Sequence, residues 1–285
     1  MQPIIYLNGE FIPRDQAKIS VMDRGFLFGD GVYEVLPAFG GKLFRLSQHL
    51  QRLNNSLRAI HMAPPHTYAE WEHILTQLVT KSLHVDNSVY LQITRGNGTS
   101  RDHAIPNNIT PTIFAMASPI PANNAVTNAQ GIVAITQEDF RWERCDIKAV
   151  TLLANVLLKH TAMSNGGFEA ILIRNGFATE GAASNLFIVR QGCIITPPTS
   201  QYLLPGITRD LILELAAANG LTYAVESIPA NDLTQAEEIW LTSSVREIMP
   251  VVKLNNQIIS HGKPGLHWQR VNNLYQTFKA NLRAD

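Results

Sequence analysis

Residues 144–148 read Arg144-Cys145-Asp146-Ile147-Lys148, and residues 179–181 read Thr179-Glu180-Gly181. A lysine side chain forms Schiff bases because its primary amine condenses with carbonyl groups. Pyridoxal phosphate also takes an acidic partner for its ring nitrogen. The lysine and the carboxylate in these two segments therefore indicate an enzyme that holds an aldehyde cofactor covalently. Taken alone, Lys148 is simply a solvated surface lysine, so the hypothesis depends on the segments around it.

The composition is that of an ordinary globular protein, with 285 residues, 45% of them hydrophobic and 16% charged, and a formal net charge of zero. This length accommodates one large domain or two smaller ones. The balanced charge gives no support to a nucleic-acid or anionic-membrane partner, and no segment is long and apolar enough to span a membrane. The N-terminus lacks the pattern of a signal peptide. The two cysteines, Cys145 and Cys193, argue against a disulfide framework and favour a cytoplasmic location.

Hydrophobic periodicity predicts the elements of the N-terminal half. A glycine-rich segment at residues 23–34 reads as a loop that enters a strand. Ser47 is the expected N-cap of a helix that carries Arg52 on its polar side. Further strands are expected at residues 4–7, 10–12 and 112–116. The apolar face of this helix is formed by Leu50, Leu53, Leu57 and Ile60. A second helix has an apolar face formed by Trp71, Ile74, Leu75, Leu78 and Val79. A strand follows, with an apolar face formed by Val89, Leu91 and Ile93.

A linker is expected at residues 119–124, where Pro, Ala and Asn cluster. It divides a small N-terminal domain, residues 1–118, from a larger domain, residues 125–285. The larger domain is predicted to contain helices at about 152–164 and after Pro205, with strands at 131–136, 168–173, 185–189, 193–195 and 238–242. Many strands, fewer helices and no regular βαβ alternation favour an α+β fold in two lobes.

Two segments of the second half have the composition of a phosphate site. Pro205-Gly206-Ile207-Thr208 opens a helix, and a helix N-terminus offers free N–H groups and a positive dipole end to a phosphate. Thr242-Ser243-Ser244 clusters hydroxyls at a strand end. Arg52 could add a bidentate guanidinium. Each feature has an ordinary alternative: a capped helix start, a polar turn and a solvated arginine.

The polar loop at residues 95–103 carries Arg101 and His103, with Asp102 between them. Two cationic donors on one loop can bind the carboxylate of an amino acid, and the Tyr33 hydroxyl could add a donor. The alternatives are a flexible surface loop and a half-buried strand tyrosine. The chain has no HExxH motif, zinc-ligand cysteine spacing, Walker A loop or G-x-S-x-G motif, so no metal site or serine-hydrolase triad is expected.

Taken together, these segments resemble the fold-type IV pyridoxal-phosphate enzymes, and most closely the D-amino-acid transaminases. The resemblance covers nearly the whole chain in one order. It rests on Asp23-Arg24-Gly25, residues 28–34, Thr94-Arg95-Gly96, Arg101-Asp102-His103, residues 144–148, Glu169-Ala170-Ile171-Leu172, Thr179-Glu180-Gly181, Gly206-Ile207-Thr208-Arg209 and Thr242-Ser243-Ser244. It implies an α+β fold of two domains, with a small α/β N-terminal domain and a larger β-barrel-like C-terminal domain.

The resemblance also implies a role for each site residue. Lys148 would form the Schiff base with pyridoxal 5'-phosphate and move the substrate α-proton, and Glu180 would pair with the pyridine nitrogen. The phosphate and cofactor contacts would come from Arg52, Leu204, Ile207, Thr208, Ser243 and Ser244, and the carboxylate trap from Tyr33, Arg101 and His103. In this family the trap is completed across a homodimer interface, so a homodimer with a shared site is implied.

The implied reaction is transamination of D-amino acids, in which D-alanine and 2-oxoglutarate give pyruvate and D-glutamate. Aminodeoxychorismate lyase and branched-chain L-amino-acid transaminase are the alternatives on the same fold, and Arg101 and His103 favour the first reading. A binding protein without catalytic activity on the same fold is an alternative of a different functional class. The presence of both Lys148 and Glu180 argues against it. Lys159 lies inside a helical run, where a solvent-facing role is simpler. Ala182-Ala183 stands where those transaminases are serine-rich, and this departure could change the reaction course.

Overall fold

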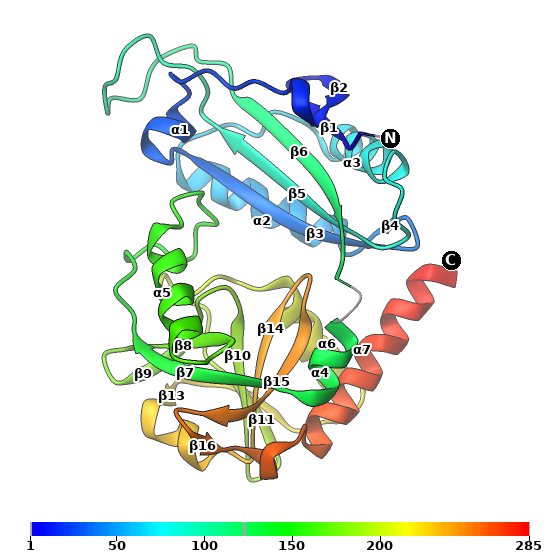
Figure 1. Cartoon of the computed structure of the whole chain (residues 1–285), viewed down its shortest axis with the longest axis vertical. Helices are drawn as coiled ribbons and strands as arrows, with labels where there is room; N and C mark the ends of the chain where they lie inside the picture. Colours follow the sequence, from blue (N-terminus) through cyan, green and yellow to red (C-terminus); the bar gives the residue numbers. More distant parts are fainter. Residues whose placement is uncertain (1, 122–123, 285) are drawn as a thin grey trace. The chain divides into compact units, whose positions relative to one another are not determined.

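The computed structural model describes residues 2–121 and 124–284, which form two compact units (Figure 1). The first unit is the chain up to Ile120 together with Ile147–Leu152, and the second is Pro121–Asp146 with Leu153–Ala284. Residues 122 and 123 of the expected linker lie outside the described residues. The assignment of residues 1–118 and 125–285 to separate domains stays a prediction. No helix in the described ranges has the length and apolar content needed to cross a membrane.

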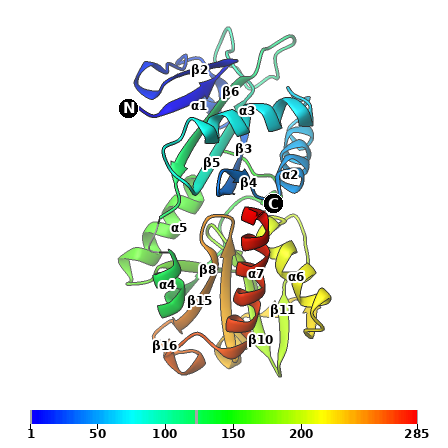
Figure 2. The same cartoon turned by 90° about the vertical axis from the view of Figure 1, so that its right-hand side faces the viewer.

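The first unit is a six-stranded antiparallel sheet covered on one face by two helices (Figure 2). The strand order is β2-β1-β6-β5-β3-β4. The strands are β1 (Ile4–Leu7), β2 (Glu10–Pro13), β3 (Gly31–Phe39), β4 (Lys42–Leu43), β5 (Asn87–Thr94) and β6 (Thr112–Pro119), and the helices are η1 (Arg14–Gln16), α1 (Arg24–Phe28), α2 (Leu46–Ala59) and α3 (Tyr68–Thr80).

The core of this unit lies between the sheet and helices α2 and α3. The predicted apolar faces of both helices and of β5 are buried, apart from the half-buried Ile60 at the end of α2. Side chains alternate along β3 as a pleated strand requires, so Val32 and Leu36 face this core together with one charged residue, Glu34.

The start of α2 differs from the prediction. The helix begins at Leu46, and the N-cap residue is Arg45, at φ 52°, with no side-chain cap hydrogen bond. Ser47 was therefore the wrong N-cap, because the chain enters the helix earlier, through a left-handed residue. Helix α3 instead has a full capping box between Thr67 and Glu70, which satisfies two of its free N–H groups.

The second unit is built on a sheet that closes into a barrel, as the family resemblance implied. Six strands follow the order β10-β14-β15-β7-β8-β9, and β9 pairs again with β10. Closure leaves these six strands without an open edge. The strands are β7 (Ile132–Glu138), β8 (Glu169–Arg174), β9 (Phe177–Gly181), β10 (Asn185–Arg190), β11 (Cys193–Thr196), β12 (Tyr223–Val225), β13 (Ile228–Pro229), β14 (Glu238–Ser243), β15 (Glu247–Leu254) and β16 (Gln257–Ile258).

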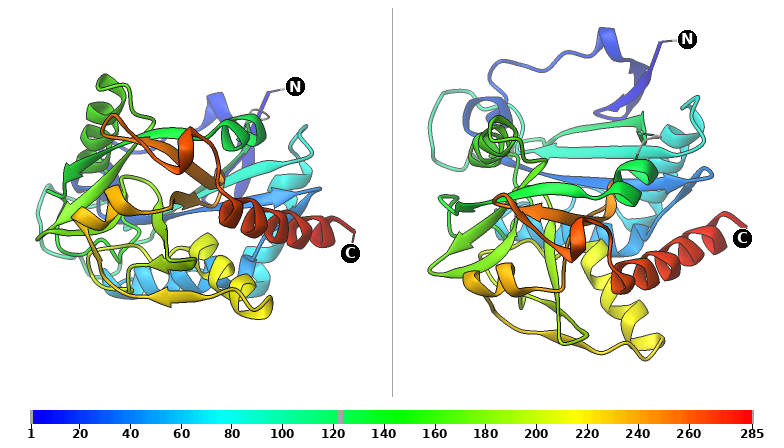
Figure 3. Two further views of the ribbon diagram at one scale, coloured as in Figure 1. Left: turned by 90° about the horizontal axis from the view of Figure 1, so that it is seen from below. Right: turned by 60° about the horizontal axis from the view of Figure 1, so that its bottom comes forward.

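Helices surround this barrel. They are α4 (Asn124–Gln130), α5 (Leu153–Ser164), α6 (Ile207–Ala218), η2 (Ala230–Gln235), η3 (Ser260–Gly262) and α7 (Leu266–Ala284). Helix α7, red in Figure 3, lies beside the orange strands β14 and β15. The buried Glu238 carboxylate accepts the backbone N–H groups of His267 (2.9 Å) and Trp268 (2.8 Å). A charge on β14 therefore fixes where α7 begins.

Candidate active site

Lys148 belongs to the first unit, where backbone pairing fixes it against β3. The N–H of Tyr33 donates to the Lys148 carbonyl at 2.9 Å, and the N–H of Val150 donates to Gly31 at 3.1 Å. The N–H of Lys148 donates to the Ser56 hydroxyl of α2 at 3.2 Å. Its ammonium lies 4.3 Å from the centre of the Tyr33 ring. Strand β3 and helix α2 therefore both fix the backbone position of Lys148, and with it the direction of its Cα–Cβ bond.

A buried charge cluster lies beside this segment. Glu34 is fully buried, and its carboxylate accepts the Nε (2.7 Å) and Nη2 (2.8 Å) of Arg52. It also accepts Nδ1–H of His49 at 2.8 Å. Arg52 is buried rather than placed on a polar face of its helix, so that prediction was wrong. The reason is Glu34: a charge on the core face of β3 draws the guanidinium inward.

Electrostatics fix the protonation of this cluster. Burial works against ionisation of Glu34, but Arg52 and His49 outweigh it and hold the pKa of Glu34 well below its usual range. Burial lowers the pKa of His49, and the charges of Arg52 and Lys148 add to this against the opposing effect of Glu34. The neutral ring donates through Nδ1, and its Nε2 is buried without a partner among the described residues.

Lys159, the rival lysine, has a structural partner. Its ammonium donates to the Phe168 carbonyl and lies 3.7 Å from a carboxylate oxygen of Glu169. It was expected to face solvent, yet its side chain is only 34% exposed. The lysine holds α5 to β8, which leaves Lys148 as the stronger candidate for the Schiff base.

Arg101 and His103 come together on one aromatic ring of the first unit. The guanidinium of Arg101 lies 5.2 Å from the centre of the Phe28 ring, and the His103 ring lies 5.1 Å from it. Arg24 supports the loop by donating to the carbonyls of Asp102 (2.6 Å) and His103 (3.3 Å). Both predicted donors are exposed, so the loop is anchored while its nitrogen donors remain accessible.

Tyr33, the third predicted member of the carboxylate trap, stacks its ring on that of Tyr90 at 5.6 Å. Within the described ranges, no hydrogen bond or ring contact joins Tyr33 to Arg101 or His103.

Glu180 lies in the second unit, at the position where the barrel closes. It is opposite Asn185 in the pairing of β9 with β10. Its Oε1 accepts Nη1 of Arg141 at 2.7 Å. Its Oε2 accepts the N–H of Leu204 at 3.0 Å and, more weakly, the Asn185 amide at 3.4 Å. Burial raises the pKa of Glu180 to about 7, although Arg141 and Leu204 oppose the shift.

The residues of this unit fit a pyridoxal phosphate. A carboxylate offers about four acceptor positions, and the three donors on Glu180 leave room for the N–H of a pyridinium. Gly206, the N-cap of α6, has no side chain to cap the helix. A Cβ at Gly206 would come 1.7 Å from the Asn185 side chain, so the chain needs glycine there. The N–H groups that open α6, with the buried Thr208, suit a phosphate.

The remaining predicted phosphate donors end β14, a strand that α6 contacts. Ser243 is the last residue of that strand, and Ser244 begins the turn after it. The Ser243 hydroxyl accepts the N–H of Arg246 at 3.4 Å, which leaves its proton available to an anion.

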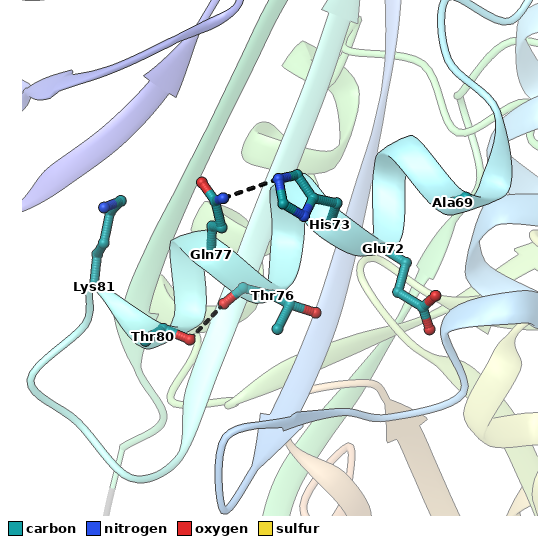
Figure 4. Close-up of a pocket in the computed structure, with 7 residues that line it drawn as sticks. All are labelled: Ala69, Glu72, His73, Thr76, Gln77, Thr80 and Lys81. Atoms are coloured by element: carbon teal, nitrogen blue, oxygen red, sulfur yellow. Dashed lines mark hydrogen bonds between the residues drawn. The ribbon is translucent and has the colours of Figure 1, made fainter.

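A surface pocket elsewhere in the first unit takes in none of these groups. It follows the outer side of α3 and is lined by residues such as Glu72, His73 and Gln77 (Figure 4). His73 and Gln77 hydrogen-bond to each other at 2.9 Å. This is the polar face of an amphipathic helix, so the candidate chemistry stays with the two residue sets described above.

The chain matches the family described as Amino-transferase class IV over residues 31–254. The chain belongs to the class IV aminotransferases. It is 39% identical to a D-alanine aminotransferase of Bacillus licheniformis, with 92% of each chain covered. It is 36% identical to one of Listeria monocytogenes, with 92% of this chain and 91% of the relative covered. The T.th. branched-chain amino acid aminotransferase with pyridoxamine 5'-phosphate matches its fold at TM-score 0.89 and 26% identity, over 99% of this chain and 96% of that one.

This class IV aminotransferase is therefore a pyridoxal-phosphate enzyme of the expected fold type. Sequence reasoning missed three buried residues that bond to candidate site residues or to one another beside them: Glu34, His49 and Arg141. Glu34 had a signal, since it takes an inward position in the alternation of β3 between Val32 and Leu36. Arg141 and His49 had none, because only long-range contacts place them.

Proposed function

We propose that this aminotransferase moves the amino group of D-alanine to 2-oxoglutarate, which yields pyruvate and D-glutamate. Relatives named D-alanine aminotransferase, 39% and 36% identical over 92% of the chain, support this substrate. The structural observation that carries the proposal is the placement of Arg101 and His103 on one ring. Two nitrogen donors on one anchored loop suit the carboxylate of an amino acid.

Each remaining site residue has a part in the proposed reaction. Bound pyridoxal phosphate supplies the electron sink that makes the Cα–H bond of the substrate acidic. Lys148 holds the cofactor through Nζ and moves the proton at the substrate Cα. Glu180 accepts the hydrogen bond of the ring nitrogen and so favours its protonated form.

The phosphate is bound by neutral and charged donors together in this proposal. Ile207 contributes its backbone N–H, and Thr208, Ser243 and Ser244 contribute hydroxyls. Arg52 adds a guanidinium whose direction is set by Glu34. Leu204 packs beside the cofactor, while its N–H holds Glu180.

The proposal includes a homodimer in which the loop of Arg101 and His103 completes the site of the second copy. The exposure of α5 supports it: its apolar residues Leu153 and Met163 are 72% and 64% exposed, and exposed apolar helix faces favour association. The free thiols of Cys145 and Cys193 support a cytoplasmic location.

Mixing two impaired variants tests the shared site, with activity assayed at a D-alanine concentration well below the raised KM of Arg101→Ala. Arg101→Ala and Lys148→Ala subunits, unfolded and refolded together, should form mixed dimers in which one of the two sites is intact. About a quarter of the wild-type sites would then be restored. If the mixture is no more active than the two variants assayed separately, with mixed dimers present by mass spectrometry, the shared site is wrong.

Product analysis tests the substrate. Purified enzyme with 2-oxoglutarate is offered D-alanine, L-leucine or aminodeoxychorismate, and the products are separated on a chiral column. D-Glutamate and pyruvate from D-alanine are expected. A branched-chain L-transaminase is the second candidate, since solved structures of that name match the fold at 26% identity. L-Glutamate formed mainly from L-leucine would replace the first proposal with this one.

A further inference from the structure

Glu180 is held by an arginine that has a carboxylate of its own. Asp139 follows directly on β7, and Arg141 lies two residues further on. The side chains of Asp139, Arg141 and Glu180 are 0%, 6% and 5% exposed. All three are therefore withdrawn from water, where an unpaired charge would be costly.

The geometry makes Arg141 a rigid link between the two carboxylates. Its Nε and Nη2 donate to the two oxygens of Asp139, each at 2.9 Å, and its Nη1 donates to Glu180 at 2.7 Å. A guanidinium is planar with fixed donor directions. The bidentate bond to Asp139 along one edge therefore sets the direction in which Nη1 meets Glu180.

Arg174, at the end of β8, forms hydrogen bonds with both Asp139 and Arg141. Its Nε donates to Asp139 at 3.2 Å, and its Nη2 donates to the Arg141 carbonyl at 2.8 Å. Two arginines thus share Asp139, and the hydrogen bonds to Asp139 hold the Arg141 side chain in its orientation toward Glu180.

We propose that Arg141 and Asp139 are positioning residues for the cofactor's ring nitrogen, acting through Glu180. Arg141 orients Glu180 and favours its ionised form, and the Asp139 charge opposes that second effect. The inference rests on the proposed function, in which Glu180 pairs with the ring nitrogen.

The charges around Glu180 act in opposite directions. Burial raises the pKa of Glu180; the Arg141 charge and hydrogen bond lower it, as does the Leu204 N–H, and the Asp139 charge raises it. Arg174 is a further charge in this network, and it bonds to Asp139 and to the Arg141 carbonyl rather than to Glu180. Asn185 is an amide, and burial raises the pKa of the Cys145 thiol to about 11. Arg141 and Asp139 are therefore the pair through which the ionisation of Glu180 is set.

A purely structural tie between β7 and β9 would predict something different. Removal of either Arg141 or Asp139 would then loosen the segment after β7, and both substitutions would shift the titration of Glu180 in the same direction. Opposed electrostatic effects predict instead that the two substitutions move the titration of Glu180 in opposite directions. This difference in sign is the property to measure.

The experiment titrates Glu180 by carboxyl ¹³C NMR in the full-length, cofactor-free chain, with the signal assigned by Glu180→Gln. Arg141→Gln should lower the acid dissociation constant of Glu180 at least tenfold, and Asp139→Asn should raise it. Arg144→Gln is the matched control, since Arg144 makes a similar two-point bond to Asp146, both at 2.9 Å, but is 46% exposed. Arg141→Lys keeps the charge without the fork and serves if Arg141→Gln does not fold, with a smaller shift in the same direction.

A second readout uses the enzyme with cofactor bound. The pH dependence of the cofactor's visible absorbance should shift in opposite directions in Arg141→Gln and Asp139→Asn and remain unchanged in Arg144→Gln. The inference would be overturned if the titration of Glu180 were unchanged in both Arg141→Gln and Arg141→Lys. It would also be overturned if Arg141→Gln and Asp139→Asn shifted that titration in the same direction. Failure of the D-alanine assay alone leaves the NMR result standing, so the two proposals fail separately.

Discussion

Glu180 and Asn185 lie opposite each other at the pairing that closes the barrel, and the Asn185 amide also donates to the Leu204 carbonyl at 2.8 Å. The residue pair that completes the sheet therefore also fixes the carboxylate proposed to serve the cofactor. Closure of a barrel is a rigid constraint. The backbone of a residue placed there cannot move without breaking strand pairing.

Glu180 should make the cofactor-free chain less stable as the pH rises. Its pKa in the folded chain is raised from 4.5 to about 7, so the unfolded carboxyl loses its proton first. Stability from the protonated, buried form is complete below about pH 4.5 and is lost as the pH rises through 7. Urea unfolding at pH 5 and pH 8 should show the stability difference between Glu180→Gln and wild type shifting in favour of the variant by up to about 3 kcal/mol from pH 5 to pH 8, while transamination is lost. Equal effects at both pH values would contradict this.

Glu34 should show the opposite pH dependence. Its folded pKa is depressed below the ordinary 4.5, so its contribution is present above that value and is lost as the pH falls below it. Glu34→Gln removes the partner of a buried arginine and should cost about 3–5 kcal/mol at pH 7. The difference between variant and wild type should shrink at pH 4, as measured by urea midpoints. Glu70→Gln, on the exposed start of α3, is the control and should change stability far less.

Lys148→Ala should abolish covalent attachment of the cofactor. Borohydride reduction followed by mass spectrometry should show no adduct, and turnover should fall by about 10³-fold or more because the Schiff base and the proton carrier are lost together. Lys159→Ala is the matched control. That lysine holds α5 to β8, so the variant should keep the adduct and most of the turnover. An adduct and full activity in Lys148→Ala would remove its assigned role.

Arg101→Ala should weaken substrate binding more than cofactor binding. Loss of one charged hydrogen bond to a carboxylate is worth about 1.5–3 kcal/mol, so KM for D-alanine should rise about 10- to 100-fold. Cofactor affinity, measured by fluorescence titration, should change less than threefold. Arg144→Ala, an exposed arginine in its own ion pair, should leave both unchanged. An unaltered KM in Arg101→Ala would end the carboxylate assignment.

The sequence predicted the parts of this fold that depend on local patterns. The apolar faces of α2 and α3 and the alternation in β5 are as expected, because helix and strand periodicity follow from neighbouring residues alone. The expected helix at 152–164 and the helix start at Pro205-Gly206 are also present as α5 and α6. The cap at Ser47 was wrong, because the left-handed Arg45 that precedes α2 leaves no periodic trace.

The site divides in the same way. Lys148, Glu180 and the helix-opening Ile207 and Thr208 stand out in the sequence, because their residue types suit the chemistry of one cofactor, and their roles stay predictions. The burial of Arg52 and the link from Asp139 through Arg141 to Glu180 were decided by tertiary structure. Glu34 and Arg52 are joined by strand-to-helix packing, and Arg141 meets Glu180 only because β7 and β9 belong to one closed barrel. A side chain's residue type is local, but its charge state depends on which distant groups share its burial.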